Sequence, residues 1–424
     1  MTTDNGIGRR GLLAAAAGVA ALGVLGAPAR AAGGKVGPYR YPITPGTPQW
    51  ASLNNQQEMV DAAQLPDGLA EKMATDDLLT TVLAYPLLAH ALAADDPRAG
   101  LQTVLGRSKA AQELLHRPDA AAAMLRRYSA FDPSIPATAT PLQAGRRTID
   151  AWRLEALLSL PAMLAAPPRG HLKALLRVGR AHLDAKSAHA GVYGANFLGG
   201  GATADLLHGT LTRAQTGTAD GCGRTDGPVS IAAVRRAVDQ HLEGATIQAC
   251  TIPKISDPNS VTYYYMQTPN GTNIQYFSAP SLTSSQVSCL NSDSDAVWPQ
   301  ATRETSATYR YNCHSYAFYS TSDSSNSRWV ERMWWDKAQQ IFYPNVSRYW
   351  TDGSYKQWST PVIYYSGMRW VYWTSNQSDG GHSAIEVGTT GYLRSKWGVY
   401  GRMYHKWDYV PSVYPMGDIR QYYR

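Results

Sequence analysis

The sequence lacks several features that would assign its class at once. After residue 31 it has no apolar run long enough to cross a bilayer, so we expect no membrane span in the mature chain. It has no Gly-rich phosphate loop, no zinc-protease helix motif and no Gly-x-Ser-x-Gly elbow, so we expect neither a nucleotide nor a metal cofactor. Its net charge of +7 is spread along the chain without a dense basic cluster, which gives no support to nucleic-acid binding.

The first 31 residues have the composition of an export signal. Arg9 and Arg10 precede an apolar run over residues 12–26, and residues 29–31 offer the small-x-small pattern that signal peptidases cleave. A run of about 15 residues is too short to span a bilayer, so we expect cleavage rather than anchoring. The paired arginines favour the twin-arginine route. We therefore predict a secreted, extracellular protein.

The composition changes near residue 220. Of the 12 tryptophans, 10 follow residue 290, and of the 26 tyrosines, 21 follow residue 260. The earlier part is rich in Ala and Leu, which favour helices, and the later part in aromatic and β-branched residues, which favour strands. We therefore expect a multidomain chain, with an α-helical N-terminal domain followed by an α+β domain with an antiparallel sheet.

Periodicity and cap residues place the elements. In the first part we expect helices over 76–88, capped by Thr75, and over 120–128, 148–163 and 170–187, with a loop over 132–141 and a short helix over 230–242. In the second part, alternation predicts strands over 368–373, 382–387, 392–397 and 401–405, which form an antiparallel meander. The domain boundaries that follow are a signal at 1–31, a linker at 32–49, a helical domain at 50–215, a linker with a short helix at 216–250, and the sheet-bearing domain at 251–424.

One cysteine and one histidine in the second part have the placement of a catalytic pair. Cys313 stands at the expected start of a helix, where peptide dipoles stabilise a thiolate, and His382 stands at the start of a strand. A nucleophilic thiol needs such activation and a base within hydrogen-bond reach. The adjacent His314 points about 100° away from Cys313 on a helix, which favours packing or lining a cleft over acting as the base.

The four cysteines of an exported chain offer an alternative. Cys313 with Cys289, and Cys222 with Cys250, would account for all four as two disulfides. In that case Cys313 is structural, and the aromatic strands form the surface of a binding protein.

A series of motifs carries a family resemblance. They are Thr268-Pro-Asn-Gly-Thr, Tyr311-Asn-Cys-His-Ser-Tyr-Ala-Phe, His382-Ser-Ala-Ile-Glu-Val and Ser395-Lys-Trp-Gly followed by His405, and they occur in order over roughly residues 260–424. This series resembles exported bacterial proteins with a papain-like domain related to the NlpC and CHAP cell-wall amidohydrolases. The resemblance implies a nucleophile at Cys313 and a general base at His382, acting on an amide. The helical stretch 50–130 resembles a module that often precedes this domain.

Two further roles in catalysis can be assigned to residues near the expected pair: the orientation of His382 and the oxyanion hole. His405 is favoured over Ser395 to orient His382, since an imidazole can hold another imidazole, while Glu386 lies too far along the strand. Tyr311 or Asn312 is expected to assist the backbone N–H of Cys313 in an oxyanion hole. The predicted function is thiol-dependent hydrolysis of cell-wall peptides or protein amides, by a monomer without a cofactor. The alternative is an extracellular binding protein for a polysaccharide or a protein on the same scaffold.

Overall fold

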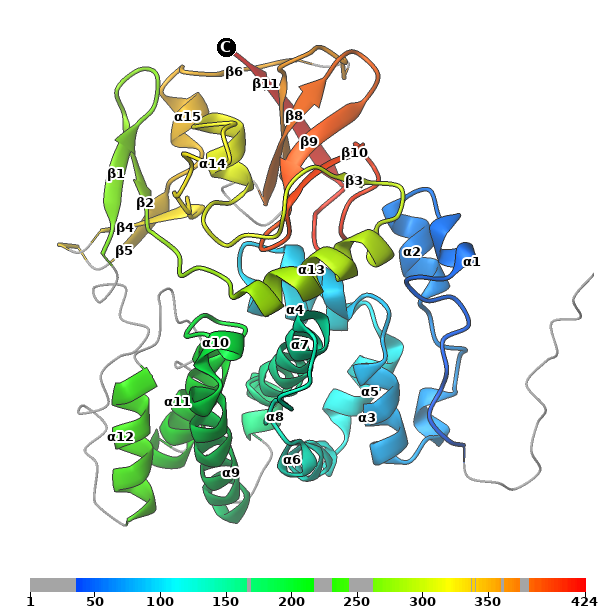
Figure 1. Cartoon of the computed structure of the whole chain (residues 1–424). Helices are drawn as coiled ribbons and strands as arrows, with labels where there is room; N and C mark the ends of the chain where they lie inside the picture. The colour runs from blue at the N-terminus through cyan, green and yellow to red at the C-terminus, as the bar shows by residue number, and fades with distance from the viewer. Residues whose placement is uncertain are drawn as a thin grey trace, which may run out of the picture. The chain divides into compact units, whose positions relative to one another are not determined.

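The computed structural model describes residues 36–165, 169–216, 231–243, 262–336, 338–339, 341–359, 362–373 and 381–424 of the chain (Figure 1). The expected signal over 1–31, most of the linker over 216–250 and the first residues of the expected second domain lie outside these ranges. Within them, no helix has the length and apolar character needed to cross a membrane.

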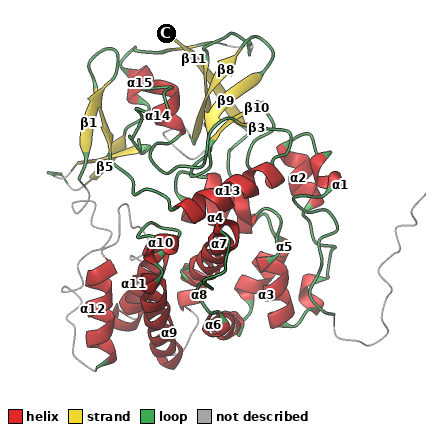
Figure 2. Cartoon of the chain, viewed as in Figure 1, coloured by secondary structure: helices red, strands yellow, loops and turns green. Residues whose placement is uncertain are grey.

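The described residues up to 243 form mainly helices, as the Ala- and Leu-rich composition predicts (Figure 2). The side chains of Asn55, Asp96, Ser108 and Thr140 cap α2, α4, α5 and α7. The helices are α1 (Pro48–Ala51), α2 (Gln56–Ala62), η1 (Ala70–Lys72), α3 (Thr75–Leu83), η2 (Leu88–Ala93), α4 (Pro97–Gly106), α5 (Lys109–His116), α6 (Ala120–Ala130), α7 (Pro141–Leu158), α8 (Pro161–Ala165), α9 (Arg169–Ala188), α10 (Ala190–Tyr193), α11 (Gly200–Thr216) and α12 (Ile231–Leu242).

The prediction of one helix over 76–88 with Thr75 as its cap is wrong in two respects. Ala74 is the N-cap of α3, and Thr75 is its first residue, whose Oγ1 donates a hydrogen bond to Asp119. The helix ends at Leu83 because Pro86 lacks an N–H and disfavours helical geometry at the residue before it. The chain then continues as the separate 3₁₀ helix η2.

The second part contains an antiparallel sheet of seven strands in the order β3-β10-β9-β8-β7-β11-β6. The predicted meander is confirmed as β7 to β10, with the strand at His382–Val387 at its predicted bounds. The elements of this part are β1 (Tyr264–Gln267), β2 (Asn273–Tyr276), α13 (Ser284–Val297), β3 (Thr302–Arg303), α14 (Cys313–Phe318), β4 (Met333–Asp336), β5 (Ile341–Pro344), α15 (Arg348–Thr351), β6 (Lys356–Gln357), β7 (Arg369–Trp373), β8 (His382–Val387), β9 (Tyr392–Lys396), β10 (Arg402–Lys406) and β11 (Asp418–Tyr423).

The two faces of the sheet pack against different partners. On one face, Val371 and Ile385 share a core with Tyr316 and Phe318 of α14. On the other face, Trp370 and its neighbours join a larger core that includes residues of the helical part. Successive side chains of a strand point to opposite faces of the sheet. Alternate residues of each strand therefore pack against α14 and against the helical part.

The helical and sheet-bearing parts share the larger core, and residues 36–424 form one compact unit. The η2 segment makes several of the hydrogen bonds between the two parts. Tyr400 Oη donates to Ala89 O at 2.9 Å, Tyr414 Oη donates to Ala93 O at 2.7 Å, and the Ser412 N–H donates to His90 Nδ1 at 2.9 Å. The domain boundaries inferred from composition stay a prediction, while the described residues on both sides pack together.

Gly398 lets the turn after β9 approach η2. Its φ is +46°, and a Cβ there would lie 2.5 Å from Leu92 O. Both the backbone conformation and the space therefore favour glycine at this position.

A buried ion pair lies inside the helical part. Lys186 Nζ lies 2.7 Å from Glu155 Oε2, and the two side chains are 1% and 0% exposed. Thr203 Oγ1 and Tyr128 Oη also donate to Glu155 Oε1, at 2.7 and 2.9 Å. The network satisfies each charged group with directed hydrogen bonds, which is the condition for retaining charge in a core.

Glu386 of β8 is a buried carboxylate on the face that packs against the helical part. It is 1% exposed, and its Oε1 accepts a hydrogen bond from the Gly391 N–H at 3.0 Å. Burial raises the pKa of Glu386 from its ordinary value of 4.5 to about 7.

Lys186→Met should destabilise the fold by about 3–5 kcal/mol, because it leaves the Glu155 carboxylate buried without a countercharge. The double variant Glu155→Gln with Lys186→Met should lose less, since it buries no net charge. Urea unfolding followed by circular dichroism measures both. If the unfolding free energy of Lys186→Met lies within about 1 kcal/mol of the wild-type value, the ion-pair interpretation is contradicted.

Gly398→Ala should lower stability by about 2–4 kcal/mol, from a non-glycine residue at positive φ and from the clash with η2. Gly417→Ala is the matched control, because a Cβ there meets nothing within 4 Å. Thermal melts of the two variants side by side test the contact, and equal melting temperatures would refute it.

Glu386 should make the fold less stable as pH rises from 4.5 to about 7. In that window the folded chain still holds the Glu386 proton and the unfolded chain has released it, so each pH step favours unfolding. Glu386→Gln keeps an acceptor for Gly391 and cannot ionise. The fall in melting temperature across the window should be smaller in this variant, and an unchanged fall would show that other groups cause it.

Candidate functional site

Cys313 is the first residue of α14, as the sequence predicts, and it is 1% exposed. Asn312 is the N-cap, with an extended backbone, and its Oδ1 accepts a hydrogen bond from the Ser315 N–H at 3.2 Å. The Asn312 Nδ2 donates to Val330 O at 2.7 Å. The cap therefore fixes both the helix start and the direction of the thiol.

Asp95 from the helical part meets this thiol. It lies between η2 and α4, where the docking of η2 against the sheet places its carboxylate beside α14. The Cys313 thiol lies 3.7 Å from Asp95 Oδ2 and 3.9 Å from Oδ1, and Asn312 Nδ2 donates to Oδ2 at 3.0 Å. No sequence signal points to this residue, because 218 positions separate it from Cys313 and the local pattern explains only its neighbour, the helix cap Asp96.

His314 completes a three-residue cluster. Its Nδ1 lies 2.7 Å from Ser383 Oγ, and its Nε2 lies 3.5 Å from Asp95 Oδ2. Ligand-type atoms of Asp95, Cys313 and His314 all lie within 4.8 Å of one another. The sequence favoured packing or lining a cleft for His314, and the ring is buried and faces Asp95, the carboxylate partner of the thiol.

Burial dominates the electrostatics of this cluster. Burial raises the pKa of Cys313 well above its usual value, the Asp95 charge raises it further, and the Ser383 backbone N–H opposes this by donating to the sulfur. Burial likewise raises the pKa of Asp95 to about 6, against the nearby charges of Arg332 and Lys396. The expectation of a thiolate stabilised at a helix start does not match this environment, which favours the protonated thiol.

Lys396 of β9 lies buried beside the cluster. Its Nζ donates to Thr308 O at 2.8 Å and to Gly398 O, and it lies 5.4 Å from the centre of the Tyr311 ring. Burial lowers the pKa of Lys396 to about 7, while Asp95 and Cys313 act to raise it. Acid, thiol and amine are thus enclosed together.

His382 does not share the face of the sheet that carries α14. Ser383 faces α14, because its hydroxyl contacts His314, so the preceding residue points to the other face. There the His382 ring stacks on Tyr414, with centroids 3.7 Å apart and planes 9° apart. Both of its ring nitrogens are buried without a hydrogen-bond partner among the described residues. The structure therefore forms no hydrogen bond between Cys313 and His382.

The predicted helper residues bond elsewhere. His405 Nδ1 donates to Lys406 O at 2.7 Å, which leaves Nε2 to accept from Ser395 Oγ at 2.8 Å. Ser395 also accepts from Trp397 Nε1 at 2.7 Å. His405 and Ser395 thus bond to each other and do not orient His382 by hydrogen bonds. The Tyr311 hydroxyl, expected as an oxyanion donor, donates to Asp323.

The cysteine alternatives are partly resolved. Cys289, in α13, and Cys313 are both free and buried, so the disulfide between them is not formed. Burial raises the pKa of Cys289 to about 12. The second suggested pair, Cys222 with Cys250, lies outside the described residues.

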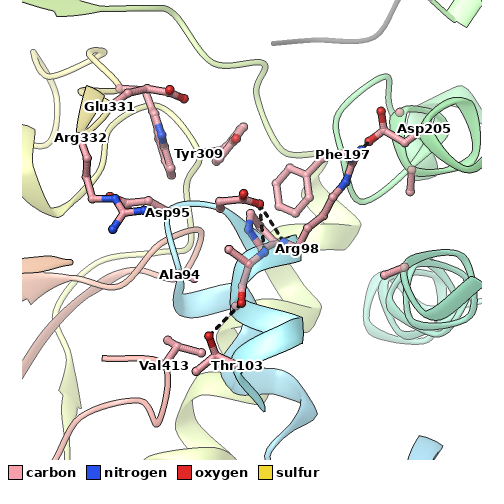
Figure 3. Close-up of a pocket in the computed structure, with 18 of the residues that line it drawn as sticks. Ala94, Asp95, Arg98, Thr103, Phe197, Asp205, Tyr309, Glu331, Arg332 and Val413 are labelled. Atoms are coloured by element: carbon pink, nitrogen blue, oxygen red, sulfur yellow. Dashed lines mark hydrogen bonds and ion pairs between the residues drawn. The ribbon is translucent and has the colours of Figure 1, made fainter. Parts of the chain in front are cut away.

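A cavity of about 540 Å³ lies against the cluster. Asp95, which is 17% exposed, belongs both to its wall and to the cluster, and Gly381 and Tyr414 line the same wall. Figure 3 shows Asp95, Arg98, Arg332, Phe197 and Tyr309 among the side chains that line the cavity. Its size is that of cavities that hold small ligands or a short piece of a chain.

The wall of the cavity combines aromatic and charged side chains. Phe197 and Tyr309 contact each other with ring centroids 4.9 Å apart, and Arg98 forms an ion pair with Asp205 of α11. Both signs of charge are present, so the cavity suits a zwitterionic or mixed ligand better than a strongly acidic or basic one.

Comparison with known proteins finds no family model, no curated protein and no solved structure that matches this chain.

Proposed function

We propose that the chain is a thiol-dependent hydrolase of amides, with Cys313 as its nucleophile. The observation that carries this proposal is the meeting of Cys313, His314 and Asp95 in one buried cluster, whose member Asp95 also lines a cavity. A thiol, an imidazole and a carboxylate in mutual reach are the groups that nucleophilic catalysis with proton transfer requires.

The geometry favours His314 over His382 as the proton acceptor. When Nδ1–H donates to Ser383 Oγ, the lone pair of His314 Nε2 remains free and lies within 4.8 Å of the thiol. Burial, with the nearby charge of Arg332, lowers the pKa of His314 to about 3, so Nε2 holds a proton only during the transfer, while it faces Asp95 at 3.5 Å. The thiol sulfur then attacks the carbonyl carbon, the proton passes to the leaving amine, and water hydrolyses the acyl-enzyme.

The cavity and the sequence both favour a peptide as the substrate. Aromatic walls beside charges of both signs fit the side chains and backbone of a peptide, and Asp95 connects this space with the thiol. The export signal that the sequence predicts, together with the resemblance to papain-like cell-wall amidohydrolases, supports cell-wall peptides or secreted proteins as substrates.

Binding without catalysis is the second candidate. It is favoured by the complete burial of the Cys313 side chain and by the raised pKa of its thiol, both of which keep the sulfur protonated and covered. In this case the cavity holds a ligand, and the cluster only stabilises its wall.

Cys313→Ala should lower amide hydrolysis by at least about 10³-fold, because it removes the nucleophile. Release of amine from peptide amides and from peptidoglycan fragments measures the rate. Cys289→Ala is the matched control, since it removes the second buried free thiol of the described residues, which lies outside the cluster. His314→Gln should lose about 10²-fold or more, and His382→Gln less than about tenfold. Activity that survives in Cys313→Ala would refute the nucleophile, and the reverse order of the two histidine variants would assign the base to His382.

A further inference from the structure

We propose that Asp95, Cys313 and His314 form a binding site for Zn²⁺, with three protein ligands and a fourth position open to the cavity. This proposal goes beyond hydrolysis and stands whether or not Cys313 is a nucleophile. It also departs from the sequence expectation of no metal, which no motif spacing could have corrected because Asp95 joins the cluster only in the fold.

The two separations that involve Asp95 are close to those around a tetrahedral ion. Bonds of about 2.0 Å to oxygen or nitrogen and 2.3 Å to sulfur place tetrahedral ligands about 3.3–3.6 Å apart. The structure has 3.5 Å between His314 Nε2 and Asp95 Oδ2, and 3.7 Å between Cys313 Sγ and Asp95 Oδ2. The third pair, Cys313 Sγ and His314 Nε2, lies within 4.8 Å, so it has to close by up to about 1.3 Å when the ion binds. Mixed oxygen, nitrogen and sulfur donors favour Zn²⁺ over Mg²⁺ or Ca²⁺.

The groups around the ligands already hold them in place. Ser383 Oγ accepts from His314 Nδ1 at 2.7 Å, which directs Nε2 into the cluster. Asn312 Nδ2 donates to Asp95 Oδ2 at 3.0 Å, leaving Oδ1 as well for the ion. Metal-binding imidazoles and carboxylates are oriented by such outer hydrogen bonds.

The His314 ring also gives an independent indication of a ligand. The ring is 0% exposed, and its Nε2 has no hydrogen-bond partner among the described residues. A buried polar atom left without a hydrogen bond costs about 1–3 kcal/mol, so it is retained where something satisfies it. A Zn²⁺ ion between Nε2, Asp95 and Cys313 would do so.

The binding step balances in charge and protons. Zn²⁺ forms a bond to the Cys313 sulfur, and the thiol proton leaves to solvent, so the thiolate and the Asp95 carboxylate together neutralise the ion. Water enters from the cavity at the fourth position, because Asp95 lies on the cavity wall. Metal binding would occupy both the sulfur and the Nε2 lone pair, so it would block the proposed hydrolysis reversibly.

The experiment titrates the reduced, chelator-treated full chain with ZnCl₂ in competition with a chromophoric chelator. It is repeated with Co²⁺, whose near-ultraviolet absorption reports thiolate coordination. We expect one ion per chain and a thiolate band. Cys313→Ser and His314→Gln should weaken Zn²⁺ binding by more than about 100-fold, and Ser383→Ala by about 10–100-fold through loss of ring orientation. Cys289→Ser is the matched control and should bind as the wild type does.

Each outcome decides the proposal. Unchanged affinity in the Cys313 and His314 variants would place the ion elsewhere and overturn it, as would the absence of stoichiometric binding in the wild type. If a variant fails to fold by circular dichroism, the wild-type Co²⁺ spectrum decides, and a spectrum without the thiolate band overturns the site. Because binding is measured without substrate, a chain that binds Zn²⁺ but is inactive in its zinc-free form would refute the hydrolase alone.

Discussion

The docking of η2 into the sheet-bearing part is the constraint on which the candidate site depends. Hydrogen bonds from Tyr400 and Tyr414 to carbonyls of Ala89 and Ala93 fix this short segment, and Asp95 follows two residues later. A 3₁₀ helix with all of its side chains buried tolerates little displacement, since the surrounding core is close-packed. The carboxylate beside Cys313 is therefore positioned by tertiary packing, far from the local sequence that surrounds the thiol.

Enclosing an acid, a thiol and an amine in one place carries an electrostatic cost. Burial shifts the pKa of Asp95 and Cys313 upward and the pKa of Lys396 downward, so all three shifts oppose charge. The mutual attraction of these groups offsets part of that cost when they ionise together. Groups of this kind cluster more often at sites of chemistry than in structural cores, which is why the cluster supports a function.

Local signals predicted the elements that depend on local physics. Alternation located β8 at His382–Val387, and the apolar spacing after Cys313 located α14, because each pattern reflects burial of one face. Helix α13 was missed, since Ser284–Val297 is polar over much of its length and is held by its contact with the helical part. The capping box formed by Thr283 and Gln286 was the available signal.

The site itself was only half predictable. The motif around Cys313 pointed to the thiol that lies in the cluster. The histidine in that cluster is the adjacent His314, whose ring contacts Ser383, and not the predicted His382. The sequence could not show which of His382 and Ser383 faces α14, because that depends on how the strand sits against the helix. Asp95 could not be predicted either. Its contact with Cys313 joins two parts of the chain that are far apart in the sequence and meet only in the fold.

The alternation along β8 has a consequence for how such chains can diverge. His382 and Ser383 are neighbours on a strand whose two faces meet different surroundings, Tyr414 on one side and His314 on the other. Adding or removing a single residue ahead of β8 would exchange the two, because a one-step slip reverses every side chain of a strand. Two chains could thus carry an identical His-Ser pair, yet direct the histidine toward the thiol in one and the serine in the other. Whether the segment before the strand has an odd or an even number of residues therefore matters as much as the motif itself.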